Sequence, residues 1–176
     1  MAGGEGRSTV ETVVTFLEMS APPSLFVPTP ANMRLALMRT ERMPVHFYRY
    51  LYDTVGRDHV WLDRKRLSDE ALVAELSAPG VEIFVLYAGG VPAGFFELDR
   101  ADEPVTWLRY FGIVPDFHGR GLGKWLLKEA LAEAWRTNPS SVRVETCTLD
   151  SPRALPLYQR LGFVPYERQN KTMVLD

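Results

Sequence analysis

The chain has 176 residues, which is the length of roughly one globular domain. Hydrophobic residues make up 46% and charged residues 24%, which is enough apolar material for one sizeable core. The 20 basic and 22 acidic residues give a net charge of −2, without the basic excess typical of proteins that bind DNA or RNA. We therefore expect no nucleic-acid partner.

Cysteine and histidine are scarce. One cysteine, Cys147, excludes an internal disulfide framework, and the three histidines are too widely spaced for a close metal-ligand pattern. We therefore expect no metal. The first residues lack the apolar core of a secretory signal, and the longest uncharged run, residues 83–96, is shorter than the ~20 residues of a membrane-spanning helix. These observations predict a cytoplasmic protein without a membrane partner.

Hydrophobic periodicity and turn residues predict the order of the elements. Residues 1–8 are rich in glycine and are expected to be flexible, and residues 9–176 are expected to form one domain. Strands are predicted at 10–19, 35–39, 81–87, 91–99, 105–114, 141–148, 163–167 and 172–175, and helices at 45–55, 68–76, 121–137 and 151–161. This order indicates a mixed α/β (α+β) fold with one mainly antiparallel, twisted sheet flanked by helices.

The segment His118-Gly119-Arg120-Gly121-Leu122-Gly123-Lys124 joins a predicted strand to the most regular predicted helix. Glycines let the backbone approach a ligand, and a helix N-terminus offers unpaired N–H donors with partial positive charge. The combination favours a phosphate or pyrophosphate site, to which Arg120, Lys124 and Arg153 would add charge. The alternative is a glycine-rich connection without a ligand. The spacing matches neither the dinucleotide fingerprint nor the P-loop.

Glu97 is an isolated carboxylate among large apolar residues of the predicted strand 91–99. Burying such a group is costly unless it has a partner, and this makes Glu97 a candidate general base. The alternative is a glutamate that faces solvent on the surface of the sheet.

Two stretches resemble the GCN5-related N-acetyltransferase (GNAT) family. Residues 113–127 are similar to its Gln/Arg-x-x-Gly-x-Gly/Ala signature, and residues 147–163 are similar to its Asn-x-x-Ala-x-x-x-Tyr-x-x-x-Gly-Phe stretch. His118 stands where the family usually has Gln or Arg, and Ser151 stands where it often has Asn. The order of elements from about residue 35 onward is also similar to that fold.

The resemblance implies an acetyl-CoA-dependent N-acetyltransferase that acts on a primary amine of a small molecule or a protein. It implies pyrophosphate binding by the amides of residues 119–124, and pairing of the pantetheine with residues 111–113, where a bulge at Gly112 would open the sheet. Tyr158 would be the acid that protonates the departing thiolate. The residues expected to bind coenzyme are Phe111, Gly112, Ile113, His118, Gly119, Arg120, Gly121, Leu122, Gly123, Lys124, Ser151 and Arg153.

The acceptor pocket is expected near the first predicted helix, a region that helps to shape this pocket in the family. His46, Tyr48 and Tyr50 are candidates to line it, and Arg109 is a candidate to contact an acidic part of the acceptor. The alternatives are a partly buried amphipathic helix and a cross-strand salt bridge of Arg109.

Two other functions remain open from the sequence. One is a catalytically silent acyl-CoA-binding sensor, because the strand 106–113 lacks an acidic residue that many relatives carry. The other is a transferase that uses a longer acyl-CoA. Members of the family commonly form homodimers, so a homodimer is also an expectation.

Overall fold

The structure is a computed structural model that describes residues 8–175. Seven strands form one sheet in the order β2-β3-β4-β5-β6-β1-β7, in which only β5 and β6 pair in parallel. The strands are β1 (Thr9–Met19), β2 (Leu35–Arg39), β3 (Val81–Ala88), β4 (Val91–Asp99), β5 (Val105–Ile113), β6 (Ser141–Cys147) and β7 (Val164–Val174). This arrangement confirms the predicted fold class.

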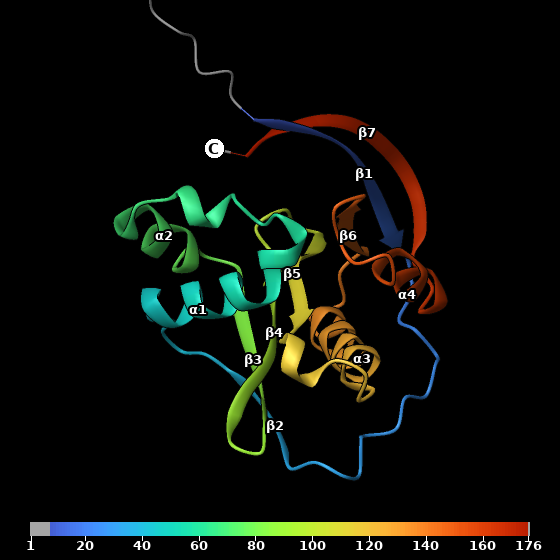
Figure 1. The fold of residues 1–176 in the computed structure, drawn as a ribbon. Coiled ribbons are helices and arrows are strands. Elements are labelled where there is room, and N and C mark those ends of the chain that lie inside the picture. Colours follow the sequence, from blue (N-terminus) through green and yellow to red (C-terminus); the bar gives the residue numbers. More distant parts are fainter. Residues whose placement is uncertain (1–7, 176) are drawn as a thin grey trace, which may run out of the picture.

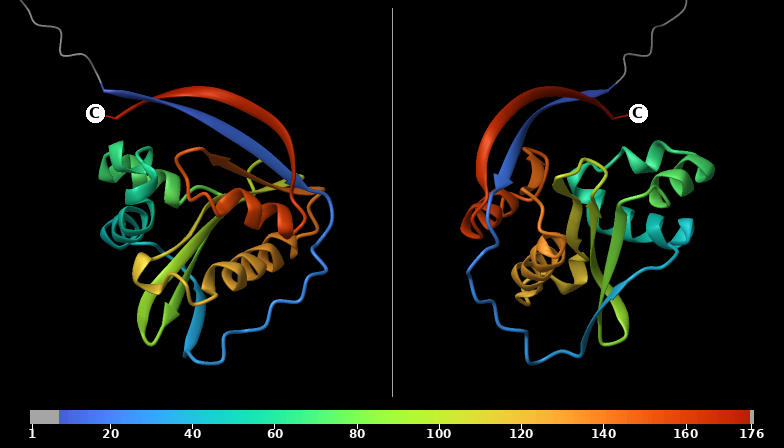
Figure 2. Two further views of the ribbon diagram at one scale, coloured as in Figure 1. Left: turned by 45° about the vertical axis from the view of Figure 1, so that its right-hand side comes forward. Right: turned by 180° about the vertical axis from the view of Figure 1, so that it is seen from behind.

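The helices lie on both faces of the sheet (Figures 1 and 2). They are α1 (Val45–Gly56), α2 (Asp69–Leu76), α3 (Leu122–Trp135) and α4 (Ala154–Arg160), with short 3₁₀ helices η1 (Arg57–His59), η2 (Arg64–Arg66) and η3 (Pro115–Phe117). Side chains of α1 and α2 form one buried cluster with Phe95 of β4, whereas side chains of α3 and α4 form the other with Phe96 and Leu98. Because both faces are covered, β4 is apolar on both sides except at Glu97 and at its last residue, Asp99.

The helix ends follow from local sequence. Ser68 Oγ accepts a hydrogen bond from the Ala71 N–H at 3.2 Å and begins α2, as predicted. The last helix was predicted from residue 151, but α4 begins at Ala154. Ser151 Oγ instead accepts from the Arg153 N–H at 3.3 Å in the preceding turn, and Pro156 falls in the first helical turn, where a missing N–H costs no helical bond.

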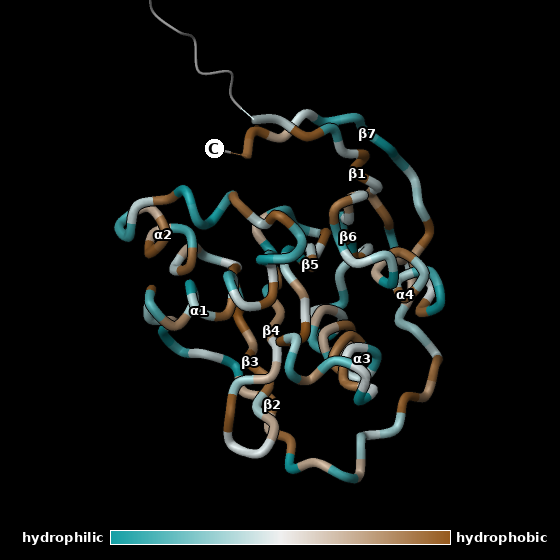
Figure 3. Tube along the Cα trace, viewed as in Figure 1, coloured by the Kyte–Doolittle hydropathy of each residue, from teal (hydrophilic) through white to brown (hydrophobic). Residues whose placement is uncertain are grey.

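The C-terminal part of the chain is one strand and not the two short strands that the sequence predicted. The polar residues 168–171 suggested a break, but β1 pairs with β7 from Thr9 to Glu18 and supplies a continuous partner. Figure 3 shows that much of β7 is hydrophilic. An outer strand with exposed side chains needs only the backbone ladder of its neighbour, so apolar alternation is not required there.

The first half of β1 and the last half of β7 form a two-stranded ribbon that arches away from the rest of the sheet (Figure 1). The strand pairing of Thr9–Val13 is with β7, because pairing with β6 begins at Val14. The Val13 carbonyl accepts a hydrogen bond from the N–H of Thr148, which directly follows β6. The Arg66 side chain, in η2, donates a hydrogen bond to the Val174 carbonyl oxygen. Ser8 continues the ribbon, since its carbonyl accepts from the Leu175 N–H at 2.8 Å. The rest of the expected flexible N-terminal segment lies outside the described residues.

Candidate active site

The sheet opens between β5 and β6. The two strands pair only from Val105–Leu108 to Ser141–Val144, although β5 continues to Ile113 and β6 to Cys147. Beyond this point β5 remains paired with β4, and β6 remains paired with β1. One edge of residues 109–113 is therefore free of β6 and can pair with an extended ligand.

The sequence placed a bulge at Gly112, and this position is wrong. The register of β4 and β5 shifts between Glu97 and Leu98, which face Tyr110 and Leu108, so Arg109 is the extra residue. Gly112 serves a different purpose. A Cβ at Gly112 would lie 2.2 Å from Val55 Cγ1, so its missing side chain lets α1 pack against β5 beside the opening.

The glycine-rich loop follows β5 and leads into α3. Gly119 and Gly121 have φ of +75° and +77°, and a Cβ at either residue would meet nothing within 4 Å. Gly121 precedes α3 without a side-chain cap, so its first N–H groups are free of side-chain partners. The loop thus has the conformation and the open space that a bound pyrophosphate requires.

His118 fixes this loop to the end of β5. Its Nε2 lies 2.9 Å from the Ile113 carbonyl oxygen, which can only accept a hydrogen bond. Arg120 and Lys124 are exposed, whereas the Leu122 side chain is buried in the core, so only the backbone of Leu122 can contact a ligand. Ser151 and Arg153 lie after β6, in the turn before α4.

Tyr158 of α4 lies beside the opening, against β5. Its ring contacts Phe111 of β5 at 6.5 Å and Phe163 at 5.7 Å between centroids, and its side chain is 6% exposed. Burial, and to a lesser extent the nearby Asp150 carboxylate, raise the pKa of Tyr158 above its ordinary value. The phenol therefore keeps its proton at neutral pH, as an acid at this place must.

Glu97 lies within a closed network on the α1 side of β4. Tyr48 Oη donates to Glu97 Oε2 at 2.8 Å, and Arg64 Nη2 donates to Glu97 Oε1 at 2.7 Å. Burial raises the pKa of Glu97, while Arg64 and Tyr48 oppose the shift. Glu97 and Tyr48 are 0% exposed, so a substrate reaches neither unless the network opens.

The other predicted acceptor residues are not gathered at the opening. His46 is exposed near the start of α1, about 14 Å along the helix from Val55 at its end. Tyr50 is 47% exposed and stacks on Phe47. Arg109 pairs with Asp99 at 3.1 Å, which is the cross-strand salt bridge that the sequence left as the alternative.

Sequence reasoning did not single out Trp61, Arg64 or Asp150. No sequence motif points to a role for Arg64, because residues 64–66 have the composition of a basic segment exposed to solvent. Asp150 occurs within the second motif stretch but matches no position of it. Trp61 Nε1 donates to Asp150 Oδ1 at 3.4 Å, which joins the segment after α1 to the turn after β6.

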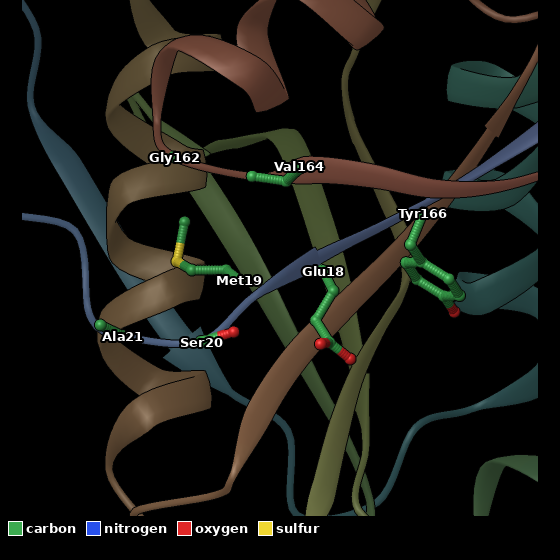
Figure 4. Close-up of a pocket in the computed structure, with 7 residues that line it drawn as sticks. All are labelled: Glu18, Met19, Ser20, Ala21, Gly162, Val164 and Tyr166. Atoms are coloured by element: carbon green, nitrogen blue, oxygen red, sulfur yellow. The ribbon is translucent and has the colours of Figure 1, made fainter.

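A pocket of about 500 Å³ lies elsewhere (Figure 4). It is formed where β1 ends and β7 begins, and it includes Glu18, Met19 and Tyr166. Met19 faces Val142 in the part of β6 that is still paired with β5, so this pocket is at the closed end of the sheet. In residues 8–175 we find no cluster of His, Cys, Asp and Glu suited to a metal, and no helix able to cross a bilayer.

Comparison with known proteins agrees with this geometry. A profile of the Acetyltransferase (GNAT) family matches residues 41–163, which is more than half of the chain. The chain belongs to the GNAT family. The matched region contains β5, the glycine-rich loop, α3 and α4, so it spans both sides of the opening.

Solved GNAT structures share the fold. A GNAT-family acetyltransferase from Novosphingobium aromaticivorans has 13% identity and a TM-score of 0.63, over 98% of this chain and 68% of that chain. A GCN5-related N-acetyltransferase from Sphaerobacter thermophilus has 18% identity and a TM-score of 0.60, over 97% and 53%. This chain therefore spans about half to two thirds of the length of these proteins.

An aminoglycoside N-acetyltransferase in complex with CoA is 25% identical, with a TM-score of 0.55 over 80% of this chain and 94% of that chain. This similar structure is one that contains bound CoA. The GNAT family uses acetyl-CoA as its acyl donor.

Proposed function

We propose that this protein is an acetyl-CoA-dependent N-acetyltransferase that acetylates a primary amine. The observation that carries the proposal is the opening between β5 and β6, which begins after Leu108 and Val144 and has the glycine-rich loop at one end. A free strand edge beside an uncapped helix N-terminus suits a ligand that has both an extended polar chain and a pyrophosphate.

The roles of the chain's residues follow from their positions. The amides of residues 119–124 hold the pyrophosphate, with His118 fixing the loop, and Arg120 and Lys124 supply positive charge. Backbone groups of 111–113 pair with the pantetheine and orient the thioester carbonyl for a backbone N–H donor. Ser151 and Arg153, in the turn before α4, are proposed to contact the coenzyme from the other side of the opening.

Tyr158 protonates the departing thiolate. Its side chain is buried against Phe111, and its raised pKa keeps the phenol protonated in the range where the enzyme works. The proposed acceptor is an amine because the same opening borders an aromatic group and a carboxylate, Trp61 and Asp150.

The test is a thiol-release assay with acetyl-CoA and a panel of amines that includes an aminoglycoside, a polyamine and lysine-containing peptides. The proposal expects at least one amine to raise CoA release above the rate of hydrolysis. Tyr158→Phe should then lower kcat about 10²-fold while the Kd for acetyl-CoA stays within about twofold. A protein that binds acetyl-CoA but releases no CoA with any amine would instead be the silent binder.

Chain length of the donor is tested in the same assay by replacing acetyl-CoA with butyryl-CoA and octanoyl-CoA. Val55 packs onto Gly112 beside the opening and narrows it on the α1 side. The proposal therefore expects the highest kcat/KM with acetyl-CoA. A higher value with octanoyl-CoA would favour the transferase that uses a longer acyl group.

A further inference from the structure

Asp150 has one occupied and one nearly free carboxylate oxygen. Its Oδ2 accepts a hydrogen bond from Thr146 Oγ1 at 2.7 Å and another from the Cys147 N–H at 2.8 Å. Within residues 8–175, its Oδ1 accepts only from Trp61 Nε1, at 3.4 Å, which is long for an N–H···O bond. The two short bonds fix the carboxylate, so Oδ1 keeps a defined direction with spare capacity to accept a proton or a hydrogen bond.

Trp61 is held against Asp150 at a local cost. The preceding residue, Val60, is β-branched yet has φ of +57°, a conformation that such residues rarely adopt. A Cβ at Gly56 would lie 2.5 Å from the Trp61 side chain, so a glycine is needed there. The ring packs against Tyr52 and Tyr110, each at 5.3 Å between centroids, and these two rings also contact each other. Phe95 contacts the same ring at 6.4 Å. The strained Val60, the glycine at position 56 and these ring contacts together fix the direction of the Trp61 indole N–H.

We propose that Asp150 and the aromatic ring of Trp61 form the binding site for the protonated amine of the acceptor, and that Asp150 Oδ1 takes its proton. This inference rests on the proposed N-acetyltransferase function. An ammonium group is a better donor to a carboxylate than an indole, so it displaces the long bond from Trp61. The partly exposed Trp61 ring then stabilises the cation and its alkyl chain.

The position of Asp150 suits this role better than that of Glu97. Asp150 is partly exposed and lies near enough to Tyr158 for its carboxylate to affect that phenol, whereas Glu97 is 0% exposed and holds two charged or polar partners. The groups near Asp150 are Trp61, Thr146, the Cys147 backbone and Tyr158, none of which carries a charge at neutral pH. On the α1 side, the Arg64 guanidinium lies 5.3 Å from the centroid of the Tyr110 ring, but it is already paired with Glu97 at 2.7 Å and Glu75 at 3.1 Å. A cation therefore meets one unpaired negative group there.

Asp150 and Tyr158 together carry out the proton transfers of the reaction. The ammonium gives one proton to Asp150 Oδ1, and the neutral amine then forms the C–N bond at the thioester carbonyl carbon. As the C–S bond breaks, Tyr158 gives its proton to the sulfur, and the second proton lost by the nitrogen returns to the Tyr158 oxygen. Asp150 then releases its proton to water, so the products are an amide, a thiol and one proton.

The test observes the indole N–H signal of Trp61 by NMR in ¹⁵N-labelled protein, with the signal assigned from Trp61→Phe. The probes are butylammonium and 2-phenylethylammonium, compared with the neutral alcohols 1-butanol and 2-phenylethanol. The titrations are run with and without CoA. We expect both ammonium ions to shift the Trp61 signal to saturation, and the alcohols to bind at least about tenfold more weakly, since a charged hydrogen bond is worth more than 1.4 kcal/mol.

Asp150→Asn should weaken ammonium binding at least about tenfold, while Asp102→Asn, in an exposed turn, should leave it unchanged. With an amine that turns over, Asp150→Asn should lower kcat/KM about 10²-fold, and the loss should shrink as rising pH deprotonates the amine in solution. A merely structural role would lower the rate equally at every pH. Equal binding of ammonium and alcohol by the wild-type protein would overturn the proposal even if Asp150→Asn fails to fold.

A wrong assignment of the N-acetyltransferase function would be seen separately. Acetyl-CoA would then not bind, or no amine would be acetylated, but the ammonium titration without CoA would still test the Asp150 site. An absent or unsaturable shift of Trp61 overturns the ammonium site, whatever the coenzyme does.

Discussion

Gly112 of β5 lies directly against Val55 of α1, because a Cβ at Gly112 would stand 2.2 Å from Val55 Cγ1. This contact sets how closely the end of α1 approaches the opening of the sheet. The segment that carries Trp61 follows α1 at once, so the same contact helps to position the aromatic rings on that side.

Gly112→Ala should destabilise the protein by about 1–3 kcal/mol, because the stiff valine cannot turn away and α1 must shift. In a Val55→Ala background the same change should cost almost nothing. Urea unfolding of the four proteins in this double-mutant cycle measures the coupling free energy between Gly112→Ala and Val55→Ala.

Gly123→Ala is the matched control. Its Cβ would meet only Ile113, at 3.9 Å, and alanine favours the helix, so it should stabilise by up to about 1 kcal/mol. Equal costs of Gly112→Ala in both backgrounds would show that Val55 is not the obstacle.

Glu97→Gln should destabilise the protein by about 3 kcal/mol, since it removes the negative charge 2.7 Å from the largely buried Arg64 guanidinium. Glu75 also faces Arg64, at 3.1 Å, but its side chain is 48% exposed. Glu75→Gln should therefore cost less than about 1 kcal/mol. Chemical denaturation of both variants compares the two carboxylates. A larger loss of unfolding free energy for Glu75→Gln than for Glu97→Gln would contradict the role given to the buried network.

Stability should fall steeply above pH 10. Burial is the largest cause that raises the pKa of Tyr48, Tyr52 and Tyr158. Above pH ~10 the unfolded chain loses these phenolic protons while the folded chain keeps them, so the free energy of unfolding decreases by up to about 1.4 kcal/mol per pH unit for each tyrosine.

Urea unfolding between pH 8 and pH 11 measures this slope. Tyr158→Phe should make it shallower by up to about 1.4 kcal/mol per pH unit. At pH 7 the same variant should be nearly as stable as the wild type, because burial, followed by the Asp150 charge, causes the raised pKa of Tyr158, and phenylalanine keeps the buried ring. An unchanged alkaline slope would mean that the phenol ionises equally in both states.

Local signals in the sequence predicted much of the fold. Ser68 predicted the start of α2, the Gly89-Gly90 pair predicted the hairpin of β3 and β4, and glycines around residue 121 predicted the turn into α3. Each depends on residues close together in the chain. The insertion of β1 between β6 and β7 joins residues more than 120 positions apart, and no local pattern specifies it.

Only those parts of the candidate site that lie close together in the sequence could be predicted. The glycine-rich loop and Tyr158 lie in contiguous motifs, so their residues could be named from the sequence. Glu97 was correctly singled out as an unusual buried carboxylate, but its partner Arg64 lies 33 residues away in a segment that reads as solvated. The Trp61–Asp150 contact spans 89 residues, and only the folded chain reveals it.

The most direct test of the central claim is calorimetric titration of the protein with acetyl-CoA, using Gly121→Glu and Gly89→Glu. Both glycines have positive φ and open space for a side chain, so the two variants share the same backbone strain. Only Gly121 adjoins the N-terminus of α3, where an added carboxylate repels a pyrophosphate. Binding by the wild type and by Gly89→Glu, lost in Gly121→Glu, is the predicted result. Absence of binding by the wild type, or undiminished binding by Gly121→Glu, would contradict the account.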